Sequence, residues 1–129
     1  MVNEYVEPKS ALSALRAVLL LTGVDVSTNV PSTIPSTGFI RIARAGGSMP
    51  NLVTDQALMI IQVYAPNNQL AEQIMNKCRG RLRQAQGTEQ SGVWVRYWRE
   101  VGGPAEYGDP DVQGFVRWQM SGQLATSTK

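Results

Sequence analysis

The residue types that carry out most enzyme chemistry are scarce in this sequence. It contains no histidine and a single cysteine, Cys78, so it lacks the commonest general base, the commonest metal ligand and every histidine-containing triad. Without a histidine partner Cys78 has no activating base, and its position within a helical apolar stripe indicates a small buried residue. We therefore expect that the protein is not an enzyme.

Three neighbouring acids, Glu106, Asp109 and Asp111, are the remaining candidates for catalysis or metal binding. They lie among Gly and Pro residues, without the apolar enclosure that would separate two carboxyl pKa values. Asp109 and Asp111 are spaced like two calcium ligands, but no third oxygen ligand and no closing Glu follow. Gly46-Gly47-Ser48 likewise lacks the Lys-Ser/Thr pair of a phosphate-binding loop. We expect turn-forming acids, no metal and no cofactor.

Tryptophan and arginine occur together in the C-terminal third of the chain: Trp94, Trp98 and Trp118 lie near Arg96, Arg99 and Arg117. Aromatic rings beside arginines can stack on nucleic-acid bases. Strand alternation instead places Trp94 and Trp98 on one face with Arg96 and Glu100, and Trp118 on the core face. Exposed tryptophan beside arginine is typical of protein interfaces, so we predict that this face contacts another protein chain.

Two amphipathic helices are indicated. The first follows Pro8 with apolar residues at three- and four-residue spacing and ends at Thr22-Gly23. The second begins at the turn Pro66-Asn67-Asn68 and carries one apolar stripe: Leu70, Ala71, Ile74, Met75, Cys78, Leu82 and Ala85. Its last turns hold Lys77, Arg79, Arg81 and Arg83, which we expect to be solvated, although a contact with an acidic partner remains open.

Four strands are predicted, at residues 38–45, 56–65, 93–101 and 112–124. We expect the Gly- and Pro-rich stretches between them, 46–51 and 102–111, to form loops. The 56–65 strand is apolar on both faces, since Leu58, Ile60 and Tyr64 lie opposite Ala57, Met59, Ile61 and Val63. In a chain of 129 residues, such a strand needs either helices on both sides of the sheet or a neighbouring subunit against one face.

These elements predict one α+β domain over residues 1–129, with two helices packed on a mostly antiparallel four-stranded sheet, in the order α-β-β-α-β-β. Residues 24–36 form an extended connector in this prediction, and residues 125–129 a frayed tail. The net charge of +2 is too small to imply a nucleic-acid or membrane partner by itself. The longest apolar run, Ala17 to Leu21, is too short to cross a bilayer, and we expect no membrane contact.

Several short motifs occur in an order that resembles one family. They are an Arg-bearing strand ending in Ala-Gly-Gly (residues 39–47), the pattern D-x-x-L-x-I-x-x-V-Y-A (residues 55–65), a helix carrying Ala71 and Arg79, a Gly-Gly-Pro stretch followed by Asp109-Pro110, and a final strand containing Arg117. This order resembles the tail terminator proteins of long-tailed phages (siphoviruses) that infect actinobacteria, over roughly residues 39–124.

The resemblance implies a structural virion protein at the neck-proximal end of the tail, assembled in the host cytoplasm. Its expected role is a homo-oligomeric ring, usually a hexamer, that caps the tail tube, stops tube polymerisation and joins the tube to the head connector. DNA would pass through the lumen without specific binding. The expected subunit interface comprises Arg41, Leu58, Ile60, Tyr64, Trp94, Arg96 and Trp98, and the expected tube- and connector-contacting loop residues are Gly47, Ser48, Met49, Pro50, Asn51, Gly103, Pro104, Tyr107 and Asp109.

Two other interpretations remain open. The chain could be another neck, head-completion or connector-adaptor ring protein of the same kind of virion. It could also be a small nucleic-acid-binding module that uses the three tryptophans and the Arg-rich helix end.

Overall fold

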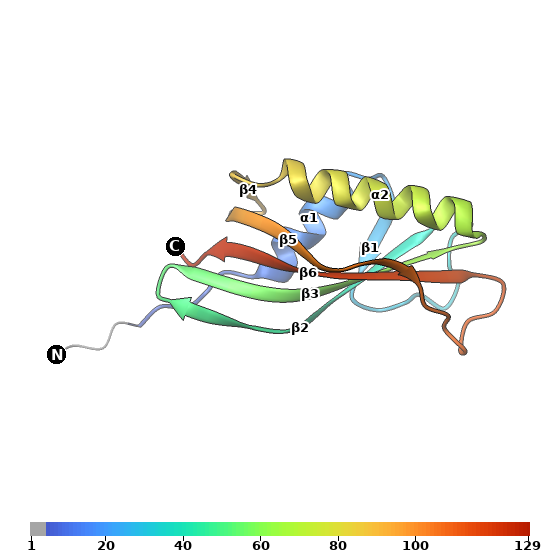
Figure 1. Cartoon of the computed structure of the whole chain (residues 1–129), viewed down its shortest axis with the longest axis horizontal. Helices are drawn as coiled ribbons and strands as arrows, with labels where there is room; N and C mark the ends of the chain where they lie inside the picture. Colours follow the sequence, from blue (N-terminus) through green and yellow to red (C-terminus); the bar gives the residue numbers. More distant parts are fainter. Residues whose placement is uncertain (1–4) are drawn as a thin grey trace.

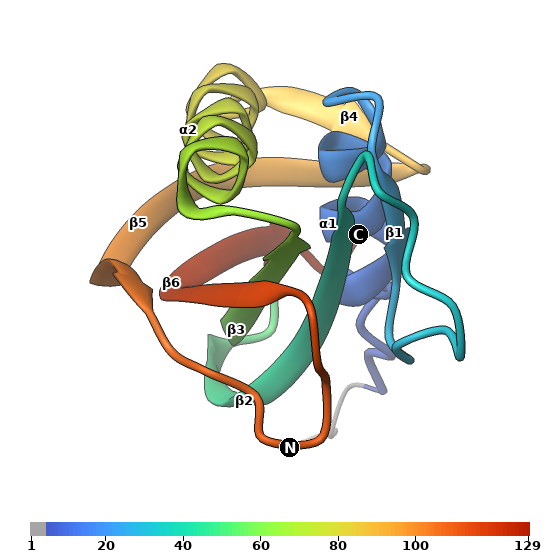
Figure 2. The same ribbon diagram turned by 90° about the vertical axis from the view of Figure 1, so that its right-hand side faces the viewer.

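The computed structural model describes residues 5–129 and contains two helices and one six-stranded sheet. The elements are α1 (Ala11–Leu20), β1 (Asp25–Ser27), β2 (Phe39–Asn51), β3 (Thr54–Ala65), α2 (Asn68–Gln84), β4 (Thr88–Gln90), β5 (Val93–Glu106) and β6 (Val116–Ser127). The strand order is β1-β2-β3-β6-β5-β4. β1 runs parallel to β2, and the other pairs are antiparallel. The sheet curls into a half-barrel, and both helices lie on its concave side (Figures 1 and 2).

The predicted four-stranded, mostly antiparallel sheet is therefore wrong: the sheet is mixed and has six strands. The two missed strands, β1 and β4, each contain only three residues, too few for alternation to be recognised. β1 lies inside the expected 24–36 connector, where its register against β2 brings Val26 into the core.

β2 and β5 both extend through stretches that the sequence predicts to be loops. Register shifts at Arg44/Gly47 and Ser48/Asn51 allow β2 to continue to Asn51. A Cβ atom at Gly47 would lie 2.0 Å from the Gln56 carbonyl oxygen, so this bulge admits only glycine. Register shifts in β5 likewise carry the strand through Gly102-Gly103-Pro104 to Glu106. The β5–β6 loop is thus confined to residues 107–115.

The C-terminal residues are ordered against the β2–β3 turn, so the predicted frayed tail at 125–129 is wrong. β6 continues to Ser127, and Ala125 and Thr126 are buried. The Thr128 amide donates to the Val53 carbonyl oxygen at 3.1 Å, and the Thr128 hydroxyl donates to the Leu52 carbonyl oxygen. These bonds hold the chain end in place.

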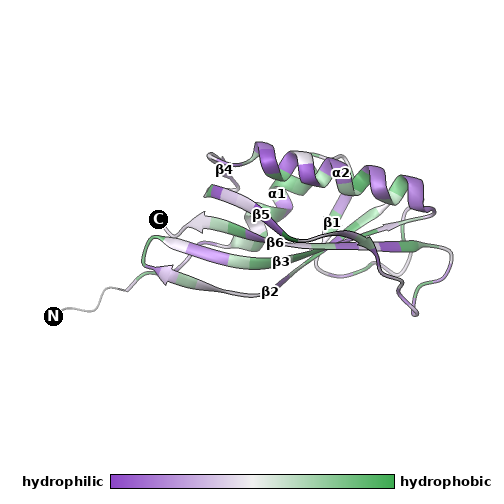
Figure 3. Cartoon of the chain, in the orientation of Figure 1, coloured by the Kyte–Doolittle hydropathy of each residue, from purple (hydrophilic) through white to green (hydrophobic). Residues whose placement is uncertain are grey.

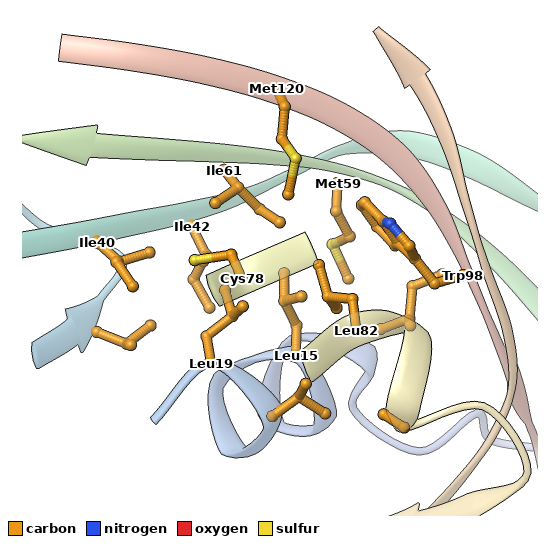
Figure 4. Close-up of a cluster of buried hydrophobic side chains, with 14 of the residues drawn as sticks. Leu15, Leu19, Ile40, Ile42, Met59, Ile61, Cys78, Leu82, Trp98 and Met120 are labelled. Atoms are coloured by element: carbon orange, nitrogen blue, oxygen red, sulfur yellow. The ribbon is translucent and has the colours of Figure 1, made fainter. Parts of the chain in front are cut away.

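The core lies between the two helices and the concave face of the sheet (Figure 4). Ser10 accepts a hydrogen bond from the Ser13 amide at the start of α1, and Asn67 accepts one from the Leu70 amide at the start of α2, so each helix begins at a side-chain cap. The apolar stripe predicted for α2 is buried, and hydropathy alternates along that helix (Figure 3). The buried sheet residues alternate with period two: Ile40, Ile42, Ala57, Met59, Ile61, Val63, Met120 and Leu124.

Candidate interaction surfaces

The convex face of the sheet carries no helix (Figures 1 and 2). We call it the outer face; the register of the ladders assigns to it Phe39, Arg41, Ala43, Gln56, Leu58, Ile60, Gln62, Tyr64, Tyr97, Arg99, Arg117, Gln119, Ser121 and Gln123. Leu58 and Ile60, predicted as interface residues, are half-buried there, while their strand neighbour Met59 is fully buried on the concave face. The apolar residues at the centre of the outer face are thus only partly covered within one copy.

Side-chain amides join the strands across the outer face. Arg41 Nη1 donates to Gln62 Oε1 and Gln62 Nε2 donates to Gln119 Oε1, each at 2.9 Å. The Arg41 Nε also donates to the Thr28 carbonyl oxygen at 3.1 Å. Each of these donors meets an acceptor, so the side chains of Arg41, Gln62 and Gln119 are held in one arrangement. None of the three carries a negative charge. Arg41, predicted at the interface, is therefore half-buried and oriented by contacts within its own chain.

Tyr64 differs from Leu58 and Ile60, because the β5–β6 loop covers it. Tyr64 is 1% exposed, and its hydroxyl donates to Asp109 Oδ2 at 2.9 Å. Arg117 also lies 3.4 Å from Asp109 Oδ2 and donates to the carbonyl oxygens of Tyr107 at 2.7 Å and Gly108 at 2.9 Å. Tyr64, predicted as an interface residue, is thus covered by the β5–β6 loop of its own chain. The same hydrogen bonds fix the shape of that loop.

The ionisation of these groups suits the arrangement. The pKa of Asp109 is lowered, first by the Asp111 amide that donates to its carboxylate and then by the Tyr64 hydroxyl. The pKa of Tyr64 is raised, mainly by burial. At neutral pH the carboxylate is therefore charged and the phenol neutral, which is the combination that these hydrogen bonds need.

Trp94 and Trp98 do not share a face, contrary to the prediction. An extra β5 residue between Val95 and Tyr97 shifts the register by one, which turns Trp98 into the core at 9% exposure and leaves Trp94 outside at 46%. Trp118 is half-buried, and its Nε1 donates to Asn68 Oδ1 at 3.1 Å. The three indoles therefore form no common stacking platform, and Trp98 is not available as a subunit contact.

The β2–β3 end of the sheet exposes apolar side chains. Gly47, Ser48, Met49, Pro50 and Asn51 are all exposed. Met49, Leu52 and Val53 are 41%, 43% and 42% exposed. The predicted interface residue Arg96 reaches this end and donates to the Val53 carbonyl oxygen at 3.2 Å. A bidentate pair between Arg44 and Asp55, at 2.9 and 2.8 Å, holds the base of the hairpin.

The β5–β6 loop lies at the opposite end of the long axis of the sheet (Figure 1). Gly103 is exposed and Pro104 half-buried within β5. Tyr107 is 60% exposed and its ring packs 5.3 Å from the Arg117 guanidinium carbon. The two sets of predicted loop residues therefore lie at two separate ends of the molecule, and only the second set retains a loop.

Sequence reasoning missed a charged groove between α2 and β5, with a volume of about 500 Å³. Arg79 pairs across it with Glu100, at 2.5 and 3.1 Å, and Arg83 and Arg99 also line it. The alternation of β5 placed Glu100 beside the tryptophans in the prediction, and no local signal indicated that it would meet Arg79. Arg79 is exposed, as expected for a solvated helix face, but it is also ion-paired within the chain.

Two further properties concern residues 5–129. No helix in this part of the chain is both long and apolar enough to cross a bilayer. No group of three or more His, Cys, Asp or Glu side chains within it is arranged to hold a metal ion.

The chain is similar in fold to a virion component. No protein-family model and no curated protein matches the sequence. A chain of the solved structure “Virion of native gene transfer agent (GTA) particle” matches with a TM-score of 0.56 and 12% identity, over 85% of this chain and 84% of that chain. At this identity the likeness establishes a shared fold.

Proposed function

We propose that this protein is a structural subunit of a virion that assembles into a closed ring. The likeness to a chain of a gene transfer agent virion, over 85% of this chain, supports the setting. The observation that carries the proposal is the half-barrel sheet, whose outer face carries no helix and whose two edges are free over part of their length. A ring needs two different, complementary surfaces on each subunit, and this sheet offers both.

The free edges lie on opposite sides of the sheet. β1 pairs with β2 only at Phe39, Ile40 and Arg41, and β4 pairs with β5 only at Val93, Trp94 and Val95. Among residues 5–129, no strand lies beyond residues 42–51 of β2 or beyond residues 96–106 of β5. Free strand edges present backbone donors and acceptors that a neighbouring subunit can use. Glycines and prolines in both stretches limit such pairing to specific registers.

Within a virion, the role that fits best is that of a tail terminator. A hexameric ring would cap the tail tube, stop its polymerisation and join it to the head connector. The β2–β3 end and the β5–β6 loop, at opposite ends of the subunit, would form the two rims, one for the tube and one for the connector. Leu58, Ile60, Trp94, Arg96 and Arg41 are then the residues left for subunit contacts. DNA would pass through the lumen without specific binding.

Imaging the purified protein tests the ring. Negative-stain electron microscopy is expected to show closed rings, with a uniform mass by light scattering that corresponds to about six subunits. A monomer at all concentrations, together with virions that contain no ring of this protein, would refute the proposal. The position of the protein in a cryo-EM map of the virion decides between a tail terminator and another neck or head-completion ring protein.

The rims have a separate test. Replacing residues 107–113 by a short Gly-Ser linker is expected to leave rings intact but to impair either tube capping or head joining. The reason is that Tyr64 and Arg117 hold this loop in one shape, in which it would contact the tube or the connector. Normal tail length and normal head joining in that variant would rule out the rim assignment.

A further inference from the structure

The groove between α2 and β5 has the charge and the shape of a peptide site. Its walls are α2, with Arg79 and Arg83, and the edge of β5, with Trp98, Arg99 and Glu100. Arg99 borders the groove, but its side chain bonds Gln123 on the outer face. Since Arg79 pairs with Glu100, the uncompensated charge in the groove is the positive charge of Arg83. Within residues 5–129 the Arg83 guanidinium has no hydrogen-bond or ion-pair partner, and the side chains of Arg79 and Glu100 remain accessible at 43% and 32%. The Arg83 guanidinium is therefore exposed and free to pair with an added carboxylate.

The floor of the groove is a free strand edge. The Trp98 amide faces that edge, because Gln86 Oε1 accepts its hydrogen bond at 3.1 Å. Alternate residues of a strand direct their backbone groups to the same edge, so Glu100 does so as well, where no strand of residues 5–129 lies. Gln86 ends this accessible stretch on one side. Since the Trp98 amide is already bonded to Gln86, an extended segment can add to β5 from Glu100 onward.

The spacing of the arginines matches such a segment. α2 runs along the strands above β5 (Figure 1), and Arg79 and Arg83 are one turn apart, which corresponds to about 6 Å along the helix axis. Side chains on one face of an added strand repeat every two residues, or about 6.7 Å. Two carboxylates at positions i and i+2 of the added strand would therefore reach the two guanidinium groups, one pairing with Arg83 and the other competing with Glu100 for Arg79.

We propose that this groove binds an extended acidic segment of another protein, which adds to the β5 edge and places carboxylates two residues apart on Arg79 and Arg83. The proposal rests on the proposed function only for the source of that protein, another component of the virion. Charge complementarity excludes a basic segment, and the edge geometry favours an extended peptide over a helix.

A binding experiment with defined peptides tests this inference. The probe is a fluorescein-labelled, end-blocked peptide TVEVEVT, measured by fluorescence anisotropy at low salt. Its controls are TVQVQVT, which lacks the charges, and TEVVVET, which has the same composition with the glutamates four residues apart. We expect TVEVEVT to bind at least tenfold more tightly than either control, and NMR amide shifts to cluster at residues 98–101 and 79–86.

Matched variants of the protein identify the groove. Arg83→Glu is expected to weaken binding of TVEVEVT at least tenfold. Arg81→Glu makes the same charge change on the same helix, but Arg81 lies outside the groove and bonds Gln84, so less than a threefold loss is expected. Equal losses in the two variants, or equal binding of the three peptides, would overturn the proposal in favour of unspecific attraction.

The alternatives give different results. Duplex DNA that binds Arg83-dependently while the peptide does not would replace the peptide site by a nucleic-acid site. Loss of rings in Arg83→Glu would make the groove a contact between copies of this chain, which also overturns the inference. If the wild-type protein binds TVEVEVT but never forms rings, the groove stands and the proposed ring function fails.

Discussion

The contact between Trp98 and Gly122 gives a sharp test of the β5 register. A Cβ atom at Gly122 would lie 2.4 Å from Trp98 Cη2, 2.5 Å from Trp98 Cζ2 and 2.7 Å from the Arg99 carbonyl oxygen. Neither the buried indole nor the paired backbone moves aside freely. Gly122→Ala is therefore expected to lower the free energy of unfolding by about 1–3 kcal/mol, the usual cost of overpacking a core.

Gly80→Ala is the matched control. Gly80 lies within α2, and a Cβ atom added there would meet nothing within 4 Å apart from the helix's own backbone. The same substitution at this position is expected to stabilise the protein by about 0.5–1 kcal/mol, because alanine favours the helix over glycine. The two variants thus add the same methyl group with opposite effects on stability.

Urea unfolding followed by tryptophan fluorescence measures both effects, at a protein concentration where light scattering shows the same oligomeric state for each variant. In addition, Trp98→Phe combined with Gly122→Ala is expected to cost less than the sum of the two single changes, since the smaller ring vacates the clashing positions. If Gly122→Ala is as stable as the wild type, Trp98 does not pack on β6 and the bulge at Val95/Tyr97 is placed incorrectly.

Four further outcomes are expected. Asp109→Asn is expected to speed amide hydrogen exchange in residues 107–113, because the Tyr64 and Arg117 contacts weaken; unchanged protection would contradict the role of this carboxylate. The pKa of Asp109 is lowered in the folded protein, so its stabilising effect is complete above its ordinary pKa of about 4 and is lost as pH falls through the lowered value; acid titrations of wild type and Asp109→Asn should therefore converge at low pH. Leu58→Ser combined with Ile60→Ser is expected to abolish rings in negative stain while circular dichroism shows a folded monomer, and intact rings would remove the outer face from the interface. Burial raises the pKa of Cys78 to about 12, so a thiol reagent should label it only at the rate of unfolding in urea-free buffer, and rapid labelling would show that the α2 stripe is open.

Some sequence signals were sufficient because they are local. The cap at Asn67 and the apolar stripe of α2 depend on residues within a few positions of one another, and the structure has both. The alternation of β3 and of β6 also holds, because the ladder between them pairs twelve residues without a register shift. The same alternation places Leu58 and Ile60 on the face opposite Met59, as the structure shows.

The features that the sequence did not predict depend on contacts between residues that are distant in the chain. One extra residue in β5 reversed the faces of Trp98 and Glu100, and no property of the 93–101 segment indicates where a partner strand will force such a bulge. Tyr64 is buried by Asp109, 45 positions away, and the chain end is held by Leu52 and Val53.

By itself, then, the sequence determined which segments become long helices and strands, because propensity, capping and periodicity act over a few residues. The tertiary structure alone decided which face each β5 residue takes and which apolar positions remain open. Those outcomes depend on strand register and on loops folding back from elsewhere in the chain, and neither is encoded at the position it affects.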